Sequence, residues 1–421
     1  MKEPKIRFQG FTGEWEKKVV GDMGTTYSGL SGKTKEDFGQ GDASFVTFLN
    51  ILTNAQIDTS ILEPVNVAKS EHQNLVKKGD LLFNTSSETP DEVGLCAVMD
   101  EDVENVYLNS FCFGFRVTDS NIDPKCVAYL MRSPIGRKLM SILGQGATRY
   151  NLSKTNFCKS DILLPSDKDE QESIAEYFRN LDSLIQSTNK KIESLKQVKT
   201  ASLQSMFPQE GETTPRVRFK GFVGEWDVVT LGSVGTFRSN GVDKLIRPEE
   251  KMINLLNYLD VYNSKHITKD NCTSLMQVSA SDRQIKECDV KKDDIFFTPS
   301  SETAEDIGHV LVANEDLPNT CYSYHLMRFR PIVGVFFEDF PNYGFMTSFV
   351  RNQMRVLAKG VQRFVIGKPE FESIKVQIPS YKEQEKIAKY FRSLDCEISA
   401  LSQQLEKLQQ IKSACLDKMF V

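Results

Sequence analysis

The sequence predicts an α+β fold in which two similar mixed α/β domains are combined with two long helices. The first observation is a repeat: residues 167–207, which open DKDEQESIAEYFRNLDSLI, return as residues 380–420, which open SYKEQEKIAKYFRSLDCEI. The second is that shorter motifs recur in the same order ahead of each copy. The third is length, because 421 residues exceed what one ordinary core supports. A duplicated chain of two domains follows.

Each copy of the long repeat is expected to form one helix. Apolar residues recur in alternating steps of four and three, which is the rhythm of a coiled-coil seam. Asp167 precedes Glu170, and Ser380 precedes Glu383, by the three residues of a capping box, which marks a helix start. Such a stripe has to be buried against a partner. The predicted helix–helix interface comprises Ile174, Phe178, Leu181, Ile185, Ile192 and Leu195 in the first copy, with Ile387, Phe391, Leu394, Ile398, Leu401, Leu405 and Leu408 in the second.

An alternative is that the copies are separate core helices of two separate domains. Uninterrupted helices of this length are uncommon in globular cores, so the paired interpretation is favoured.

A second motif stands at the start of each half. PKIRFQGFTGEW from residue 4 returns as PRVRFKGFVGEW from residue 215. Aromatic residues contribute core area before any other role, so these are expected to pack rather than to stack on bases. They are Phe8, Phe11, Trp15, Phe219, Phe222 and Trp226.

Two further motifs join a strand to a polar loop and lie ahead of each long helix. LLFNTSSETPDEVG at 81–94 returns as IFFTPSSETAEDIG at 295–308, and GATRYNL at 146–152 returns as GVQRFVI at 360–366. The segments between these motifs show little similarity. One scaffold with two different recognition surfaces would give this pattern.

The repeats define domain boundaries, and the domains are expected to be strands with a few helices, at Cys126–Leu143 and Gly344–Ala358 for example. The predicted organisation is a first domain at 1–165, a first long helix at 166–207, a linker at 208–214, a second domain at 215–379 and a second long helix at 380–421. The linker sequence QEGETT is polar and flexible.

Composition limits the class of protein. A chain that is 40% hydrophobic and 26% charged is ordinary for a soluble protein, and it has no run of 18 apolar residues, so no membrane span is expected. The N-terminus has no apolar core and does not resemble a signal peptide. The nine cysteines form no CxxC pair and only four histidines accompany them, so free thiols are expected and no zinc site.

No catalytic constellation is present in the sequence. It contains no GxxxxGK[ST] phosphate loop, no GxGxxG motif, no HExxH motif and no GxSxG elbow. The isolated His309 and His325 are expected to be surface or core residues rather than bases. We therefore predict no catalytic residue, no metal ligand and no cofactor in this chain.

One charge feature suggests a ligand, although the net charge of −5 argues against coating by nucleic acid. Residues 130–160 and 350–368 each carry several basic residues and no acidic one. A helix with a solvated basic face is the alternative, but both halves carry the feature, which favours contact with DNA phosphates. The candidate DNA-binding residues are Ser86, Ser87, Thr89, Thr148, Arg149, Tyr150, Lys154, Ser300, Ser301, Thr303, Gln362, Arg363 and Lys368.

The roles of these candidates stay open at this point. Arg149 and Arg363 either read guanine through two hydrogen bonds or hold a phosphate. The serines and threonines either donate to DNA or only shape the turns.

The arrangement resembles the specificity subunits of type I restriction-modification systems. Two dissimilar domains alternate with two long helices that open Glu-Gln-x-x-Ile-Ala, at 170–175 and 383–388. The resemblance covers essentially the whole chain. It is carried by the duplicated arrangement more than by the helix motif alone.

The resemblance implies that each domain is a target-recognition domain for one half of a bipartite double-stranded DNA sequence. It implies that the helices pack as an antiparallel coiled coil, fix the separation of the domains and dock two modification subunits. Those methyltransferase subunits bind S-adenosylmethionine and methylate adenine, and restriction (motor-nuclease) subunits join them. The chain itself is then non-catalytic, and a bacterial cytoplasmic location with no membrane partner is expected.

Outward residues of the first helix, including Gln171, Glu172 and Arg179, are expected to hold the modification subunits. Two other functions remain as alternatives. One is a cytosolic coiled-coil scaffold that does not bind DNA, and the other is a solo methyltransferase, which the absence of cofactor motifs disfavours.

Overall fold

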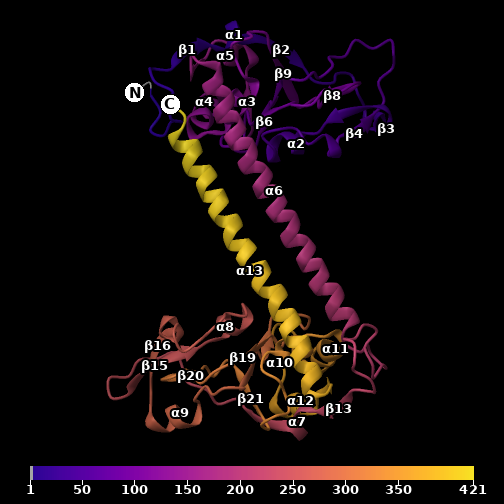
Figure 1. The fold of residues 1–421 in the computed structure, drawn as a ribbon, viewed down its shortest axis with the longest axis vertical. Helices are drawn as coiled ribbons and strands as arrows, with labels where there is room; N and C mark the ends of the chain where they lie inside the picture. The colour runs from indigo at the N-terminus through magenta and orange to yellow at the C-terminus, as the bar shows by residue number, and fades with distance from the viewer. Residues whose placement is uncertain (1–2) are drawn as a thin grey trace. The chain divides into compact units, whose positions relative to one another are not determined.

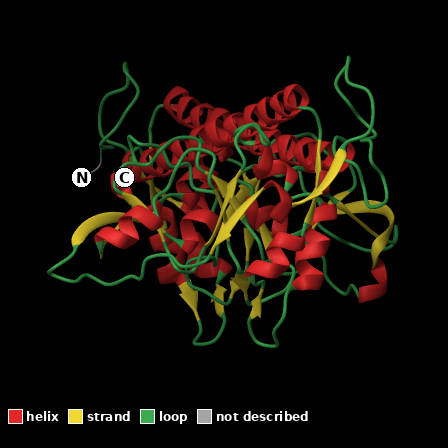
Figure 2. Cartoon of the chain, turned by 90° about the horizontal axis from the view of Figure 1, so that it is seen from below, coloured by secondary structure: helices red, strands yellow, loops and turns green. Residues whose placement is uncertain are grey.

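The computed structural model describes residues 3–421, which divide into two compact units. Of these residues, 3–189 and 403–421 form unit 1 and 190–402 form unit 2. The two longest helices, α6 (Lys168–Ser205) and α13 (Tyr381–Lys418), each contribute residues to both units (Figure 1). Figure 2 shows that the rest of the chain consists of short strands and short helices joined by long loops.

Unit 1 is built on two sheets. The larger is antiparallel, in the order β2 (Gly24–Ser28), β9 (Cys112–Val117), β5 (Asp80–Asn84) and β7 (Cys96–Val98). In the other sheet, β3 (Phe38–Val46) pairs antiparallel with β4 (Glu63–Val65) and parallel with β8 (Val106–Leu108). Small pairings join β1 (Glu16–Val19) to β12 (Asp161–Leu164), and β10 (Gly144–Gln145) and β6 (Ser86–Ser87) to β11 (Tyr150–Leu152). Its short helices are α1 (Val20–Met23), α2 (Phe48–Thr53), α3 (Pro124–Arg132), α4 (Pro134–Leu143) and α5 (Lys154–Cys158).

Unit 2 repeats this topology. Its larger sheet has the order β14 (Gly235–Arg238), β21 (Met327–Pro331), β17 (Ile295–Phe297) and β19 (Val310–Val312). Its second sheet has β15 (Lys251–Leu256) between antiparallel β16 (Met276–Ala280) and parallel β20 (Thr320–Tyr322). Small pairings join β13 (Asp227–Thr230) to β23 (Lys375–Ile378), and β18 (Ser300–Ser301) to β22 (Phe364–Val365). Its short helices are α7 (Leu231–Val234), α8 (Tyr258–Tyr262), α9 (Asp282–Glu287), α10 (Phe340–Gly344), α11 (Ser348–Leu357) and α12 (Lys368–Ser373).

The predicted α+β architecture of two repeated mixed domains and two long helices is confirmed. The short helices differ from expectation in one respect. The single helix expected over Cys126–Leu143 is two helices, because Ser133 caps α4 and Pro134 cannot continue the ladder of α3. A break also separates α10 from α11 in the corresponding part of unit 2.

The two long helices run antiparallel within each unit. In unit 1 the hydroxyl of Tyr177 lies 3.4 Å from Sγ of Cys415. Further along α6, Asp182 forms an ion pair with Lys412, which comes earlier in α13. Residues later in α6 therefore contact residues earlier in α13, which means that the helices are antiparallel. The contacts of Lys199 with Asp395 and of Ser202 with Tyr390 show the same order in unit 2.

The end of each long helix packs into a globular core. Phe420, which follows α13, packs against Trp15 of unit 1 with ring centres 6.2 Å apart. Phe207, which follows α6, packs against Trp226 of unit 2 at 5.7 Å. Both phenylalanines are almost completely buried. No helix of residues 3–421 is both long enough and apolar enough to cross a membrane.

Candidate nucleic-acid interface

In unit 1, two motifs that are far apart in the sequence pair in one small sheet. The serine loop supplies β6, and the basic segment supplies β10 and β11. Ser87 lies opposite Tyr150, and Ser86 lies opposite Asn151. The structure therefore brings together two of the motifs that the sequence singled out.

Unit 2 repeats this juxtaposition. Ser300 pairs with Val365 and Ser301 with Phe364. Here the guanidinium of Arg363 donates to Oγ of Ser300, with Nη2 at 3.0 Å and Nε at 3.3 Å. The hairpin arginine is thereby held against the serine loop.

A glycine makes each hairpin possible. Gly146 has φ +142° and Gly360 has φ +146°, in the region that L side chains rarely adopt. A Cβ on either glycine would lie 2.0 Å from the carbonyl oxygen of Arg149 or Arg363 respectively. The hairpin tips are exposed, so the chain presents an arginine at the same position in both units.

The candidate residues fall into two groups by exposure. Thr89, Thr148, Gln362 and Thr303 are exposed, as are Arg149, Arg363 and Lys368. Ser86, Ser87 and Ser301 are less than a tenth exposed, and Ser300, Lys154 and Tyr150 are intermediate. The buried serines therefore stabilise the turn and are poorly accessible to a ligand.

Ser87 illustrates this structural use. Its hydroxyl donates to Oε2 of Glu92 at 3.0 Å and accepts the backbone N–H of Thr89 at 3.3 Å. The two bonds shape the loop from within. They leave the exposed threonine hydroxyl as the group that faces outward.

The two hairpin arginines are not equally engaged. The guanidinium of Arg149 forms no hydrogen bond or ion pair with any of residues 3–421, whereas Arg363 is bonded to Ser300. Lys154 donates to Oγ of Ser28 at 2.7 Å, and Lys368 lies 3.6 Å from Glu372. Arg149 is therefore the candidate cation that is freest to bind a phosphate or a base.

Three arginines of the basic segments have a structural role that the charge pattern did not reveal. Nη2 of Arg137 donates to the carbonyls of Asp91 and Val93 at 3.0 and 2.5 Å, and burial lowers its pKa to about 10. Arg351 makes the matching bonds in unit 2, to the carbonyls of Glu305 and Ile307.

Arg132 is held in the same way. It donates to the carbonyls of Cys96 at 2.6 Å and Asn54 at 2.5 Å, and burial lowers its pKa. These three guanidiniums bond backbone carbonyls of their own unit, so they do not contribute to a phosphate-binding face.

Sequence reasoning missed two exposed aromatic residues, one of which lies beside the serine loop of unit 1. Phe111 is 62% exposed, and its carbonyl accepts the N–H of Thr85 at 2.9 Å, next to β6. In unit 2, Tyr324 is 50% exposed and its ring lies 3.9 Å from that of His325. Burial lowers the pKa of His325, and the charges of Lys244 and Arg363 lower it further. These residues lie in the dissimilar middle segments, where no repeat signals them.

The long helices are joined to the domains by the repeated motif at the start of each half. In unit 1, Arg7 holds the buried carboxylate of Glu170 through two bonds, Nε to Oε1 at 2.7 Å and Nη2 to Oε2 at 2.8 Å. In unit 2, Arg218 holds Glu383 through the same two bonds at 2.7 and 2.8 Å. Paired guanidinium–carboxylate bonds of this kind fix orientation as well as position.

The glutamine of the same motif is buried, which corrects the expectation that Gln171 faces outward. Its amide accepts the N–H of Asp123 at 2.8 Å and donates to the carbonyl of Pro165 at 2.8 Å. Gln384 accepts the N–H of Phe337 at 2.9 Å in the matching way. The amide satisfies backbone groups of the adjoining domain and is unavailable to a partner protein.

The predicted seam residues lie on the covered face of each helix. Phe178 stacks between Tyr129 and Phe420, with ring centres 5.1 and 5.9 Å away. Phe391 lies between Tyr343 and Phe207 at 5.0 and 6.0 Å. Buried members of the predicted seam are Ile174, Phe178, Leu181, Ile192, Ile387, Phe391 and Leu394, and intermediate ones are Ile185, Leu195, Ile398, Leu401, Leu405 and Leu408.

An aspartate in each helix links the domain to the other helix. Asp182 accepts the hydroxyl of Tyr129 at 3.0 Å and pairs with Lys412. Asp395 accepts the hydroxyl of Tyr343 at 2.9 Å and pairs with Lys199 at 2.5 Å. Burial, and then the neighbouring aspartate, raises the pKa of both tyrosines, so both hydroxyls stay protonated as donors.

Two comparisons of sequence agree on a family. A family model described as "Type I restriction modification DNA specificity domain" matches residues 12–197 and 224–412. The chain is 22% identical to the StySPI specificity subunit of a type I restriction enzyme from Salmonella potsdam, over 96% of this chain and 88% of that one. It is also 22% identical to a putative type I MjaX specificity subunit from Methanocaldococcus jannaschii, over 96% of this chain and 92% of that one.

Solved structures show a similar fold. The S subunit of a type I restriction-modification system from M. genitalium matches with a TM-score of 0.61 at 15% identity, over 100% of this chain and 99% of that one. A chain from a study of type I assembly and conformational transition matches with a TM-score of 0.50 at 16% identity, over 96% and 97%. The family model covers most of the chain in two copies, one for each half. The chain therefore belongs to the family of type I restriction-modification DNA specificity domains.

Proposed function

We propose that this chain is the non-catalytic DNA-specificity subunit of a type I restriction-modification complex. The observation that carries the proposal is the duplicated interface, in which a serine loop pairs with an exposed arginine hairpin in each unit. Family membership gives the sequence-specificity role directly. The scaffold without DNA binding is not favoured by that membership.

We propose that each unit contributes one recognition surface and reads one half of a bipartite target. The strand orders of the two units match, but their exposed aromatic residues differ, for example Phe111 in one and Tyr324 in the other. Phosphate contacts position a protein on DNA, and base contacts give specificity. Two surfaces with a common frame and different exposed groups would bind two different sequences.

The long helices would set the spacing between the half-sites. Two tethered modules gain avidity only when both sites lie at the span that the tether permits. A stiff helical connection narrows that span, so the spacer length becomes part of the target.

The helices would also dock two modification subunits, each binding S-adenosylmethionine and methylating adenine, and restriction subunits would join the assembly. Extrusion of the target base costs a few kcal/mol, which binding by both recognition surfaces can offset. Since the ligand is chromosomal and invading DNA, the site of action would be the bacterial cytoplasm.

The test is selection from a random duplex library with the chain assembled with its modification subunits. We expect enrichment of a bipartite sequence with a fixed spacer. Binding should fall steeply as salt is raised, because counterions are released from neutralised phosphates. A flat, negligible binding signal at all salt concentrations would favour the scaffold instead.

A further inference from the structure

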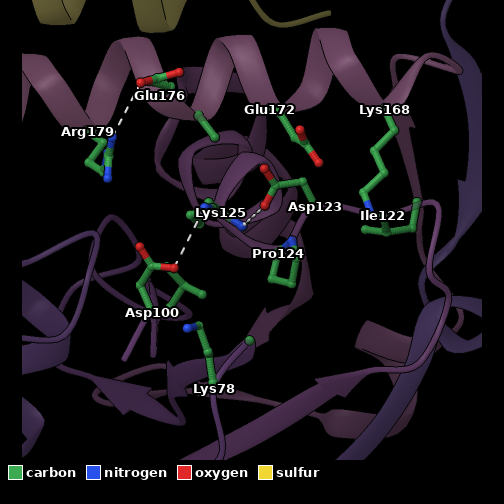
Figure 3. A pocket seen from close by; sticks show the side chains of 13 residues that line it. Lys78, Asp100, Ile122, Asp123, Pro124, Lys125, Lys168, Glu172, Glu176 and Arg179 are labelled. Atoms are coloured by element: carbon green, nitrogen blue, oxygen red, sulfur yellow. Dashed lines mark hydrogen bonds and ion pairs between the residues drawn. The ribbon is translucent and has the colours of Figure 1, made fainter. Parts of the chain in front are cut away.

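A pocket of about 410 Å³ lies in unit 1 beside the first turns of α6 (Figure 3). Glu172, Glu176 and Arg179 of α6 form one wall, and Asp123 and Lys125 at the start of α3 form another. None of the candidate DNA-contact residues lines it. It is therefore a separate feature of the unit.

The pocket contains a buried carboxylate with one unsatisfied oxygen. Asp123 is 4% exposed, and its Oδ1 caps α3 by accepting the N–H of Lys125 at 2.8 Å. Its Oδ2 has no hydrogen-bond partner among the described residues. Burial raises the pKa of this carboxyl, and the nearby charges of Glu172 and Asp100 raise it further. A buried acceptor without a donor is costly.

The cations that line the pocket are engaged elsewhere. Lys125 forms an ion pair with Asp100 at 3.7 Å, and Lys168 donates to the carbonyl of Ser120 at 2.7 Å. Lys78 pairs at 3.0 Å with an aspartate that does not line the pocket. No ammonium group among the described residues of unit 1 bonds the unsatisfied oxygen of Asp123.

The corresponding place in unit 2 is filled by the unit's own side chains. Tyr129 and Tyr343 are equivalent, because each bonds an aspartate of a long helix. Asp123 and Phe337 lie the same number of residues before these tyrosines, so they occupy corresponding positions. The ring of Phe337 packs on Tyr381 at 5.5 Å. Unit 2 therefore has an apolar contact where unit 1 has a buried charge.

The arginine that closes this place in unit 2 is turned away in unit 1. Arg392 pairs with Glu338 at 3.0 Å and also with Asp339. In unit 1, Arg179 stands at the position of Arg392. Lys125 stands at the position of Asp339, so a basic residue replaces the acidic partner. Arg179 cannot pair with Lys125, because like charges repel, and its guanidinium instead lies 3.4 Å from Glu176 on its own helix.

The two units also differ in the charges at the rim of this pocket. In unit 2, Glu385 pairs with Lys389 at 2.6 Å. In unit 1, Glu176 occupies the position of that lysine, and Glu172 has no ion-pair or hydrogen-bond partner among residues 3–421. Figure 3 shows the carboxylate of Asp123 facing this rim, while Arg179 is drawn toward Glu176 at 3.4 Å.

We propose that this pocket receives an arginine or lysine side chain of a protein partner, with Asp123 and Glu172 as its acceptors. The inference rests on the proposed docking of modification subunits on the long helices and names the chemistry of one contact. In unit 2 the guanidinium of Arg392 pairs with Glu338 and Asp339, so a guanidinium–carboxylate contact already forms on this side of the matching scaffold. No group of three or more His, Cys, Asp or Glu residues suited to a metal ion exists within residues 3–421, so an organic cation fits better.

The proposal makes the two docking faces unequal. Unit 1 would bind its partner through a cation supplied from outside, whereas unit 2 has satisfied its own acids. Two copies of the same modification subunit would then dock through different contacts.

The test measures the affinity of the full chain for its modification subunit, free of DNA, by titration calorimetry. Asp123→Asn removes the charge and keeps the helix cap, because asparagine caps as well as aspartate. We expect the variant to fold normally and to bind the subunit at least about tenfold more weakly, as loss of a buried charge partner implies. Glu172→Lys lies on the exposed rim, cannot disturb the core, and should weaken binding through repulsion.

The matched control is Asp339→Asn, which breaks the internal pair with Arg392 and should lower stability rather than subunit affinity. Normal subunit affinity in both Asp123→Asn and Glu172→Lys would overturn the pocket inference while leaving the proposed function standing. Failure of the unmodified chain to bind the subunit at all would instead refute the docking itself, and the inference with it.

Discussion

Unit 1 and unit 2 use the same ion pair to attach a domain to its long helix, but they treat the hairpin arginine differently. Arg7–Glu170 and Arg218–Glu383 have the same pair of distances, 2.7 and 2.8 Å. The guanidinium of Arg149 has no hydrogen-bond or ion-pair partner among residues 3–421, whereas that of Arg363 is bonded to Ser300. The buried Arg–Glu pairs keep the same geometry in both units, because an unpaired buried charge is costly. The exposed hairpin arginines can change their partners without that penalty.

Breaking the shared ion pair should have the largest effect. Glu170→Ala leaves Arg7 partly buried and unpaired, which should cost about 3–5 kcal/mol of unfolding free energy. Glu383→Ala should cost unit 2 the same. The chain has two tryptophans, Trp15 in unit 1 and Trp226 in unit 2, so 19F NMR of fluorotryptophan-labelled protein in urea follows each unit separately. If one variant destabilised its unit strongly and the other had no effect, the two ion pairs would not be equivalent.

Truncating the ring at the end of a long helix should have a similar or slightly smaller effect. Phe207→Ala removes a buried ring from unit 2 and should cost about 3 kcal/mol there. The Trp226 resonance should broaden or shift while that of Trp15 stays. Phe420→Ala should do the reverse, and the same response of both resonances to either change would contradict the separate packing.

Both hairpin arginines should contribute to DNA binding. Arg149→Ala and Arg363→Ala should each weaken the binding free energy by about 1–3 kcal/mol, which is roughly 5- to 150-fold in affinity. A loss that is uniform across sequences indicates a phosphate contact, and relaxed preference at one base pair indicates base reading. Ser300→Ala removes the hydrogen bonds of Arg363 to that serine and should change the contribution of Arg363 to DNA affinity. Arg149 has no comparable side-chain partner among residues 3–421 that could be removed. Unchanged DNA affinity in both arginine variants would exclude these hairpins from the interface.

The smallest expected effect concerns a turn that precedes β5 and β17. Gly79 has φ +84° and Asp293 has φ +69° at matching positions. Left-handed backbone strains most L-residues by about 1 kcal/mol, so Asp293→Gly should stabilise unit 2 and Gly79→Asp should destabilise unit 1 by about that amount. Urea midpoints from the two tryptophan resonances measure both. A loss of stability in Asp293→Gly would mean that its side chain contributes more than the strain costs.

The burial of individual polar groups could not be predicted from the sequence. Arg137 and Gln171 both carry groups that suit a surface, and each instead bonds backbone atoms of its own unit. The serine loop is similar, because Ser86 and Ser87 are covered by the hairpin strand that pairs with them. Exposure depends on what the rest of the chain places nearby, and that information is non-local.

Sequence alone determined the duplication, the two long helices and the family resemblance. These are local or periodic properties: an unbroken apolar rhythm without glycine or proline makes a helix wherever it is placed. Tertiary structure decided that the serine loop and the glycine–arginine hairpin form one sheet, and that Arg363 is held while Arg149 is free. It also decided that unit 1 has a pocket with an unsatisfied oxygen of Asp123, whereas unit 2 packs Phe337 on Tyr381 at the matching position. The physical reason is that hydrogen-bond partners and burial are set by neighbours distant in the chain, and the same motif in the two halves meets different ones.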